Sequence, residues 1–190
     1  MRSSYIQNNY GEVFYDYVKK FTPELIVELG VLDAYSTLHF AKGLEDNKKG
    51  RIDAYDLFED YQFKSSNYDE ITRKCKEIKS LKLYKMNAFK VHDQYKDNSV
   101  DILHVDISND GDTVRRIMKL WNSKIVDGGL IMFEGGSLER DEIEWMKKYN
   151  KESLREEFLM NQIIRDYYTY ETYVAFPSLT VLTKLRTGEE

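Results

Sequence analysis

The stretch that decides the fold is Leu25-Ile-Val-Glu-Leu-Gly-Val-Leu-Asp-Ala-Tyr-Ser36. Its first five residues form a short, mostly apolar run, which is typical of a buried strand. Gly30 follows at once, and glycine permits the tight turns and close backbone approaches that a side chain blocks. The spacing of apolar residues after Ser36 predicts a helix that ends near Gly43. The stretch therefore predicts a strand, a glycine turn and a helix in direct succession.

The same alternation continues along the chain in both directions. Amphipathic segments at 13–21, 71–78 and 114–121 predict further helices. Repeated strand and helix indicate a parallel sheet whose two faces are covered by helices. The sequence thus predicts a three-layer α/β fold, with four more strands at Arg51–Asp56, Leu81–Met86, Val100–Val105 and Leu130–Phe133.

The C-terminal region departs from this alternation. After a predicted helix around residues 143–149, a β-prone run at 168–176 meets Pro177, and a second run follows at 179–183. This pattern predicts a closing antiparallel hairpin at one edge of the sheet. We expect its tyrosines to pack and protect the edge; a wall of a substrate pocket or a homodimer surface is the alternative for Tyr167, Tyr168, Tyr170 and Tyr173.

Composition limits the classes of function. The 190 residues include 28 Lys+Arg and 33 Asp+Glu, a net charge of −5, which argues against a general nucleic-acid binder. The length fits one domain over residues 1–190. The lone Cys75 forms no intramolecular disulfide, and neither a signal segment nor a membrane-spanning run is evident. We expect a cytoplasmic protein that does not bind membranes.

Ligands of open α/β sheets bind at the carboxyl ends of the strands. Gly30 is the only glycine of a G-x-G-x-x-G pattern here, since Leu32 and Tyr35 occupy the other positions, so a pyrophosphate lacks its usual backbone cradle. S-adenosylmethionine (SAM) has no phosphate, and its cationic groups and ribose hydroxyls suit acidic residues beside a glycine turn. Asp56 ends the second predicted strand and is placed to accept hydrogen bonds from ribose.

Four motifs resemble those of the class I SAM-dependent methyltransferases, in the branch of the caffeoyl-coenzyme A and catechol O-methyltransferases and their short bacterial relatives. Residues 28–36 resemble E-[IL]-G-V-x-x-G-Y-S, with Ala34 in place of a glycine. Residues 50–56 resemble G-[KR]-[IV]-x-x-x-D. Residues 100–106 are similar to [FY]-D-x-[IV]-F-[IV]-D, and 128–135 to G-G-x-[IL]-x-x-D-N.

This resemblance implies a Rossmann-like methyltransferase fold with SAM as cofactor. It implies that Asp56 holds the ribose and that Asn87 and Ala88 contact the adenine. The residues expected to bind the cofactor are Glu28, Gly30, Val31, Tyr35, Ser36, Asp56, Leu57, Asn87, Ala88 and Asp106.

The sequence departs from this branch at the residues that carry its chemistry. In the metal-dependent relatives, an aspartate matching Asp106 and an Asp-Asn pair bind a divalent cation, but here the pair is Glu134-Gly135. Asp106 and Glu134 are therefore the candidate ligands for Mg²⁺ or Ca²⁺, an incomplete set because glycine has no side chain. The base lysine of the relatives matches Asn109, which takes up no proton at neutral pH.

Two residues are candidates for the catalytic base. Asp106 follows the fourth predicted strand, and His92 lies in a polar loop beside Asp93, whereas His104 is expected in the core. We predict transfer of a methyl group from SAM to a small-molecule acceptor, on a hydroxyl oxygen. A cofactor-binding module of the same fold without turnover is the alternative. A nicotinamide-dependent oxidoreductase is a third reading, against which the missing phosphate loop argues.

Overall fold

The computed structural model describes residues 1–186 and divides into two compact units, Met1–Val91 and His92–Glu190. The one domain expected over residues 1–190 stays a prediction. No helix in the described part of the chain is long and apolar enough to cross a membrane.

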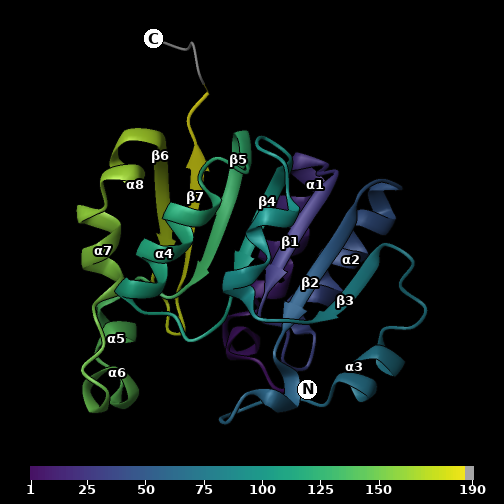
Figure 1. The fold of residues 1–190 in the computed structure, drawn as a ribbon, viewed down its shortest axis with the longest axis horizontal. Coiled ribbons are helices and arrows are strands. Elements are labelled where there is room, and N and C mark those ends of the chain that lie inside the picture. The colour runs from purple at the N-terminus through teal and green to yellow at the C-terminus, as the bar shows by residue number, and fades with distance from the viewer. Residues whose placement is uncertain (187–190) are drawn as a thin grey trace. The chain divides into compact units, whose positions relative to one another are not determined.

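The first unit is built on three parallel strands in the order β3-β2-β1 (Figure 1). The strands are β1 (Leu25–Leu29), β2 (Arg51–Asp56) and β3 (Leu81–Lys85). Every residue of β1 is buried, as expected for an apolar strand inside a parallel sheet. The helices of this unit are α1 (Tyr10–Phe21), α2 (Tyr35–Asn47) and α3 (Tyr68–Lys74), with short 3₁₀ turns at Ser4–Asn8, Phe58–Asp60 and Ala88–Lys90.

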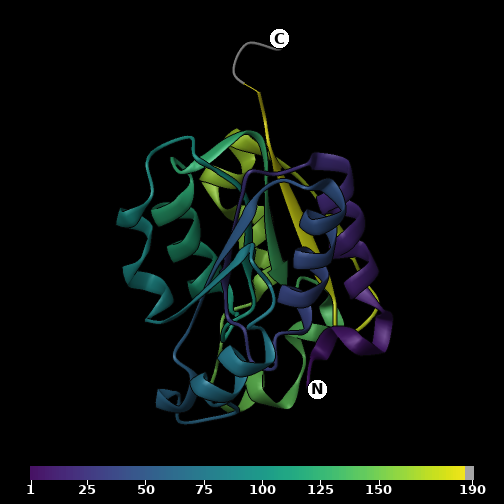
Figure 2. The same cartoon turned by 90° about the vertical axis from the view of Figure 1, so that its right-hand side faces the viewer.

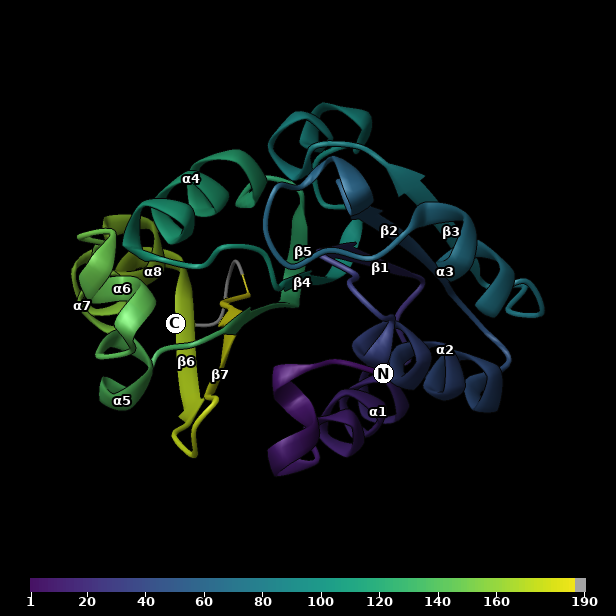
Figure 3. The same ribbon diagram turned by 90° about the horizontal axis from the view of Figure 1, so that it is seen from below.

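Helices α1 and α2 run side by side (Figure 2) and lie on the same face of the three strands (Figure 3). Phe14 of α1 packs on Phe40 of α2, with ring centroids 5.0 Å apart. A Cβ added at Gly43 would lie 2.7 Å from Cβ of Val18, so this glycine permits close contact between the helices. The prediction that α2 ends near Gly43 is therefore wrong, because the glycine serves packing and the helix continues to Asn47.

The second unit combines a parallel pair of strands with an antiparallel hairpin (Figure 1). Strand β4 (Val100–Val105) pairs in parallel with β5 (Ile125–Glu134), which pairs with β7 (Leu179–Lys184), and β7 pairs with the edge strand β6 (Tyr168–Tyr173). The predicted hairpin is confirmed. The helices are α4 (Gly111–Trp121), α5 (Leu138–Asp141), α6 (Glu144–Lys148), α7 (Leu154–Met160) and α8 (Gln162–Tyr167), with a 3₁₀ turn at His92–Gln94.

The sequence reading missed α7 and α8, and a signal for α7 was present. Ser153 accepts a hydrogen bond from the backbone N–H of Glu156, and Ser-x-x-Glu is the pattern of a capping box. Tyr167 belongs to α8 and not to the hairpin. His104 is fully buried, as expected.

Candidate active site

The turn after β1 holds its backbone in left-handed conformations. Gly30 has φ +96°, and its N–H donates to the carbonyl of Tyr55, 2.8 Å away. Leu32 and Ala34 also have positive φ, 47° and 65°. Ala34 thus adopts the angles that a glycine supplies in the related motif, and the turn keeps that shape at a conformational cost of about 1 kcal/mol per residue.

Glu28, on β1, holds the far side of this turn in place through hydrogen bonds to α2. Its side chain is fully buried, and its two oxygens accept hydrogen bonds from Oγ of Ser36 and Oγ1 of Thr37, each at 2.5 Å. Both donors lie in the first turn of α2, so the carboxylate fixes where that helix begins. The contact shows Glu28 as an anchor of the turn, and its expected role toward the cofactor stays a prediction.

Helix α2 begins without a side-chain cap, since Ala34 at its N-cap offers no acceptor. The first N–H groups of a helix have no intrahelical partner, so those of Tyr35 and Ser36 point out of the N-terminal end. Together with the helix dipole, they form a site for a carboxylate. The expected role of Tyr35 and Ser36 toward the cofactor stays a prediction.

Asp56 joins the end of β2 to the turn after β1. One carboxylate oxygen accepts from the backbone N–H groups of Val31 (2.7 Å) and Leu32 (3.0 Å), and the other accepts from Phe58 (2.7 Å). Asp56 is half-buried, as is the adjoining Leu57. Carboxylate oxygens accept more than one hydrogen bond, so the ribose role stays a prediction beside this structural one.

Asn87 and Ala88 follow β3 at the same end of the strands. Oδ1 of Asn87 accepts from the N–H of Phe89 at 2.9 Å and caps the 3₁₀ turn, while Ala88 is buried. The first unit therefore brings together every predicted cofactor-binding residue except Asp106. Contact of Asn87 and Ala88 with adenine stays a prediction.

The N-terminus contributes an ion pair that the sequence reading missed. Arg2 donates from Nη2 to Oδ1 of Asp33 at 2.6 Å and from Nε to Oδ2 at 3.1 Å, and Oγ of Ser66 also donates to Oδ1. These hydrogen bonds, Arg2 first, hold the pKa of Asp33 far below its ordinary value. The pair fastens the chain start to the turn, and nothing in the local sequence joins residues 31 positions apart.

In the second unit, Glu134 at the end of β5 is buried and paired with Arg140. Nε of Arg140 donates to Oε1 at 2.7 Å, and Nη2 donates to Oε2 at 2.9 Å. Burial alone would lower the pKa of Arg140, but the hydrogen bonds and charge of Glu134, with the charges of Asp106 and Asp141, raise it. Glu134 is therefore one half of a buried, bidentate ion pair.

Asn109 joins the ends of β4 and β5. Its Nδ2 donates to the carbonyls of Val105 (2.8 Å) and Glu134 (3.0 Å), and the side chain is fully buried. Where the related motif has a base lysine, this chain has a clamp between two strands. Asp106, the residue directly after β4, is half-buried and lies close enough to act electrostatically on Arg140.

These residues do not fit the divalent cation that the resemblance implies. Both oxygens of Glu134 are engaged by Arg140, and Gly135, with φ +113°, has no side chain to add. Residues 1–186 contain no group of three or more His, Cys, Asp or Glu side chains arranged to hold a metal ion. The guanidinium already supplies positive charge beside the candidate ligands, so the expectation of Mg²⁺ or Ca²⁺ at Asp106 and Glu134 gains no support.

His92 pairs with its neighbour. Its Nε2 lies 3.1 Å from Oδ1 of Asp93, and its Nδ1 is buried without a hydrogen-bond partner among residues 1–186. His92 and Asp106 both belong to the second unit, and a catalytic role for either stays a prediction.

Comparison with known proteins identifies the family. A family model described as a methyltransferase domain matches residues 27–134, which is more than half of the chain. This span contains the first three motifs and all but the last residue of the fourth. The chain belongs to this methyltransferase family. None of the curated proteins searched matches this methyltransferase in sequence.

Solved structures show the same fold. An O-methyltransferase from Bacillus cereus in complex with S-adenosylhomocysteine (SAH) has a TM-score of 0.70 at 15% identity, covering 96% of this chain and 84% of its own. An SAH-bound methyltransferase from Podospora anserina has a TM-score of 0.67 at 16% identity, and the match covers 96% of this chain and 80% of that one. A protein assigned as an rRNA methylase from Clostridium thermocellum has 0.64 at 18%, covering 99% of both chains.

The predicted fold class is confirmed: this is a Rossmann-like α/β methyltransferase fold, mostly parallel, with a C-terminal antiparallel hairpin. The resemblance to class I SAM-dependent methyltransferases is likewise confirmed. Two of the solved structures named above hold SAH, and use of SAM by this chain belongs to the proposed function.

Proposed function

We propose that this methyltransferase transfers the methyl group of SAM to a hydroxyl oxygen of a small molecule. The observation that carries the proposal is the half-buried carboxylate of Asp106, which directly follows β4 in the motif that resembles that of the O-methyltransferases. Several proteins of the same fold bear that name, among them the Bacillus cereus enzyme. The net charge of −5 favours a small molecule over a nucleic acid.

The first unit would hold the cofactor through its three strand ends. The N–H groups of Tyr35 and Ser36 would receive the methionine carboxylate, and the turn around Gly30 and Val31 would lie against the methionine chain. Asp56 would accept from ribose with lone pairs that its backbone donors leave free. Leu57, Asn87 and Ala88 would border the nucleoside.

SAM supplies an electrophilic methyl carbon on a sulfonium. The protein has to hold the acceptor oxygen in line with that carbon and to remove the hydroxyl proton. In our proposal, Asp106 takes this proton as the O–CH₃ bond forms and the S–CH₃ bond breaks, which leaves SAH and the methyl ether as products. His92 is the second candidate for this proton transfer.

The charge of Arg140 narrows the choice of acceptor. Opposite charges attract, so proton uptake by Asp106 works against the field of the neighbouring guanidinium. Such a base suits a hydroxyl that releases its proton readily. We therefore expect phenolic acceptors, with pKa near about 10, to react faster than alkyl alcohols.

The test is methyl transfer from isotopically labelled SAM into a metabolite extract, followed by mass spectrometry. We expect labelled methyl ethers with wild type and a loss of about 10²-fold or more in Asp106→Asn, the range for a general base. Asp101→Asn, the same change near the start of β4, serves as control. Label in ribosomal RNA added in parallel would contradict a small-molecule acceptor, and SAH binding without any turnover would favour the binding-module alternative.

The role of Asp56 needs a separate test, because its loss would also loosen the turn. Asp56→Asn is compared in calorimetric titrations with adenosine and with 2′,3′-dideoxyadenosine. If Asp56 accepts from the ribose hydroxyls, the substitution weakens adenosine binding by about 1–3 kcal/mol and leaves the dideoxy analogue nearly unchanged. Equal losses with both ligands would reduce Asp56 to a support of the turn.

A further inference from the structure

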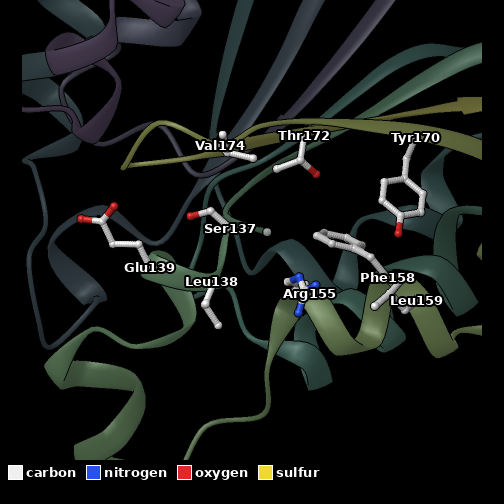
Figure 4. Close-up of a pocket in the computed structure, with 10 residues that line it drawn as sticks. Ser137, Leu138, Glu139, Arg155, Phe158, Leu159, Tyr170, Thr172 and Val174 are labelled. Carbon is white, nitrogen blue, oxygen red and sulfur yellow. The ribbon is translucent and has the colours of Figure 1, made fainter.

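The second unit contains a cavity of about 540 Å³ between α7, the edge strand β6 and the loop after β5 (Figure 4). This volume falls within the range of about 300–1,000 Å³ typical of sites for small molecules. All residues that line it belong to the second unit, between Gly136 and Val174. The cavity therefore lies within this unit, and its ligand is independent of the proposed function.

The floor of the cavity is buried and well supported. Phe158 is 1% exposed and packs on Phe133, with ring centroids 5.5 Å apart. Thr172 hydrogen-bonds to Thr180, whose hydroxyl donates to the carbonyl of Gly135, so the proton between the two threonines comes from Thr172. A ligand thus meets an aromatic ring and a fixed hydroxyl oxygen.

The rim is mostly apolar and open to solvent. Leu138, Leu159, Tyr170 and Val174 line the cavity and are among the exposed large apolar side chains of the protein. Figure 4 shows the Phe158 ring and the Tyr170 ring on the same side of the cavity. Exposed apolar side chains gathered around a hollow mark binding surfaces more often than those scattered singly.

Arg155 brings an uncompensated positive charge to this apolar surface. Its side chain is exposed and makes no ion pair or hydrogen bond within residues 1–186, while its backbone N–H donates to Oδ2 of Asp141. Arg2, Arg115 and Arg140, by contrast, each pair with a carboxylate. A guanidinium presents a planar set of donors that matches a carboxylate in bidentate geometry.

We propose that this cavity binds a small aromatic carboxylate. The ring of the ligand would lie over Phe158 between the apolar rim residues, and its carboxylate would pair with Arg155. Oγ of Ser137 accepts from the N–H of Arg140, so its own hydroxyl proton is available to the ligand. Glu139 also lines the cavity, and its charge disfavours a second anionic group, which makes a monoanion the preferred occupant.

The test is calorimetric titration of the full-length protein with naphthalene-2-carboxylate and with the uncharged naphthalene-2-carboxamide. The two probes share a ring and differ in charge. We expect the carboxylate to bind with a Kd of about 1 mM or tighter, and the amide to bind about tenfold or more weakly.

Two variants locate the site. Arg155→Gln removes the cation, and Leu159→Glu adds an anion at the half-exposed rim; each should weaken carboxylate binding by about tenfold or more. The controls are Arg165→Gln, an exposed arginine of α8, and Met160→Glu, the next residue of α7, which does not line the cavity. Both should bind the carboxylate as wild type does.

Three results would overturn the proposal. One is absence of saturable carboxylate binding at concentrations up to about 10 mM, ten times the weakest expected Kd. Another is equal affinity for carboxylate and amide. The last is an Arg155→Gln variant that binds like wild type, or a Met160→Glu variant that loses as much affinity as Leu159→Glu.

Discussion

The loops after β1 and after β5 begin alike and are stabilised differently. Each follows a buried glutamate on its strand, Glu28 or Glu134, and each starts with a glycine at positive φ, Gly30 or Gly135. Glu28 accepts hydrogen bonds from two neutral hydroxyls. Glu134 accepts them from the guanidinium of Arg140.

This difference in partners has an electrostatic consequence. Hydroxyl donors stabilise a carboxylate without cancelling its charge, so the loop after β1 suits a ligand with cationic sulfonium and amino groups. A guanidinium cancels the charge, so the loop after β5 no longer suits a divalent cation. The loop after β1 thus has a carboxylate that keeps its charge, and the loop after β5 has one that is neutralised by an ion pair.

The largest expected effect on the free energy of unfolding comes from breaking the ion pair between Glu134 and Arg140. Arg140→Ala leaves the charge of Glu134 buried and uncompensated, and should lower the free energy of unfolding by about 3–5 kcal/mol in urea titrations. Replacing both partners, as in Glu134→Leu/Arg140→Met, should restore much of the lost free energy of unfolding. Arg115→Ala, which removes a half-exposed arginine that bridges Glu152 and Glu157, should cost less than Arg140→Ala, about 1 kcal/mol. Equal effects in Arg140→Ala and Arg115→Ala would show that burial does not set the strength of the pair.

Loss of the hydroxyl contacts of Glu28 should lower the free energy of unfolding somewhat less than loss of Arg140. Glu28→Leu leaves the buried hydroxyls of Ser36 and Thr37 without this acceptor, which should cost about 1–3 kcal/mol of unfolding free energy and weaken SAH binding. The triple change Glu28→Leu/Ser36→Ala/Thr37→Val removes the unsatisfied hydroxyls. It should recover stability but not SAH affinity, and recovery of both would contradict a role of the carboxylate charge in ligand binding.

A smaller, pH-dependent effect is expected at Arg2 and Asp33. Because Arg2 lowers the pKa of Asp33 in the folded state, the stabilisation is present above the unfolded pKa of about 4 and is lost as the pH falls below it. Arg2 is half exposed, so Arg2→Gln should cost no more than about 1 kcal/mol at pH 7. The Tm difference from wild type should shrink steadily as the pH falls from about 4 toward the lowered pKa of Asp33. A difference that grows toward low pH would have the wrong sign for this pair.

Metal removal should have the smallest effect of all. With Glu134 engaged by Arg140, EDTA should leave methyl transfer unchanged, and added Mn²⁺ should give no bound signal in electron paramagnetic resonance. Bound Mn²⁺ that disappears in Glu134→Gln would contradict the replacement of a metal by the guanidinium.

The strands and the first loop could be predicted because their signals are local. The apolar runs at 25–29 and 100–105 and the turn at Gly30 each span only a few residues, and the structure places them as expected. The end of α2 was misjudged because Gly43 meets Val18, a contact between helices that no local pattern reveals.

The parts of the site that the sequence did not predict depend on contacts between residues far apart in the chain. Asn109 reaches the carbonyl of Glu134, 25 residues away, and Arg2 reaches Asp33, 31 residues away. The absence of an Asp-Asn pair at Glu134-Gly135 indicated that the metal site was altered. It did not indicate Arg140 as the replacement, since a helix arginine six residues on is usually a solvated charge.

Calorimetric titration of the full-length protein with SAH and with NAD measures directly which nucleoside the turn at Gly30 binds. If the turn at Gly30 receives a sulfonium nucleoside, SAH binds with one-to-one stoichiometry, NAD gives no binding heat, and Glu28→Leu weakens SAH. Binding of NAD without binding of SAH would contradict the account.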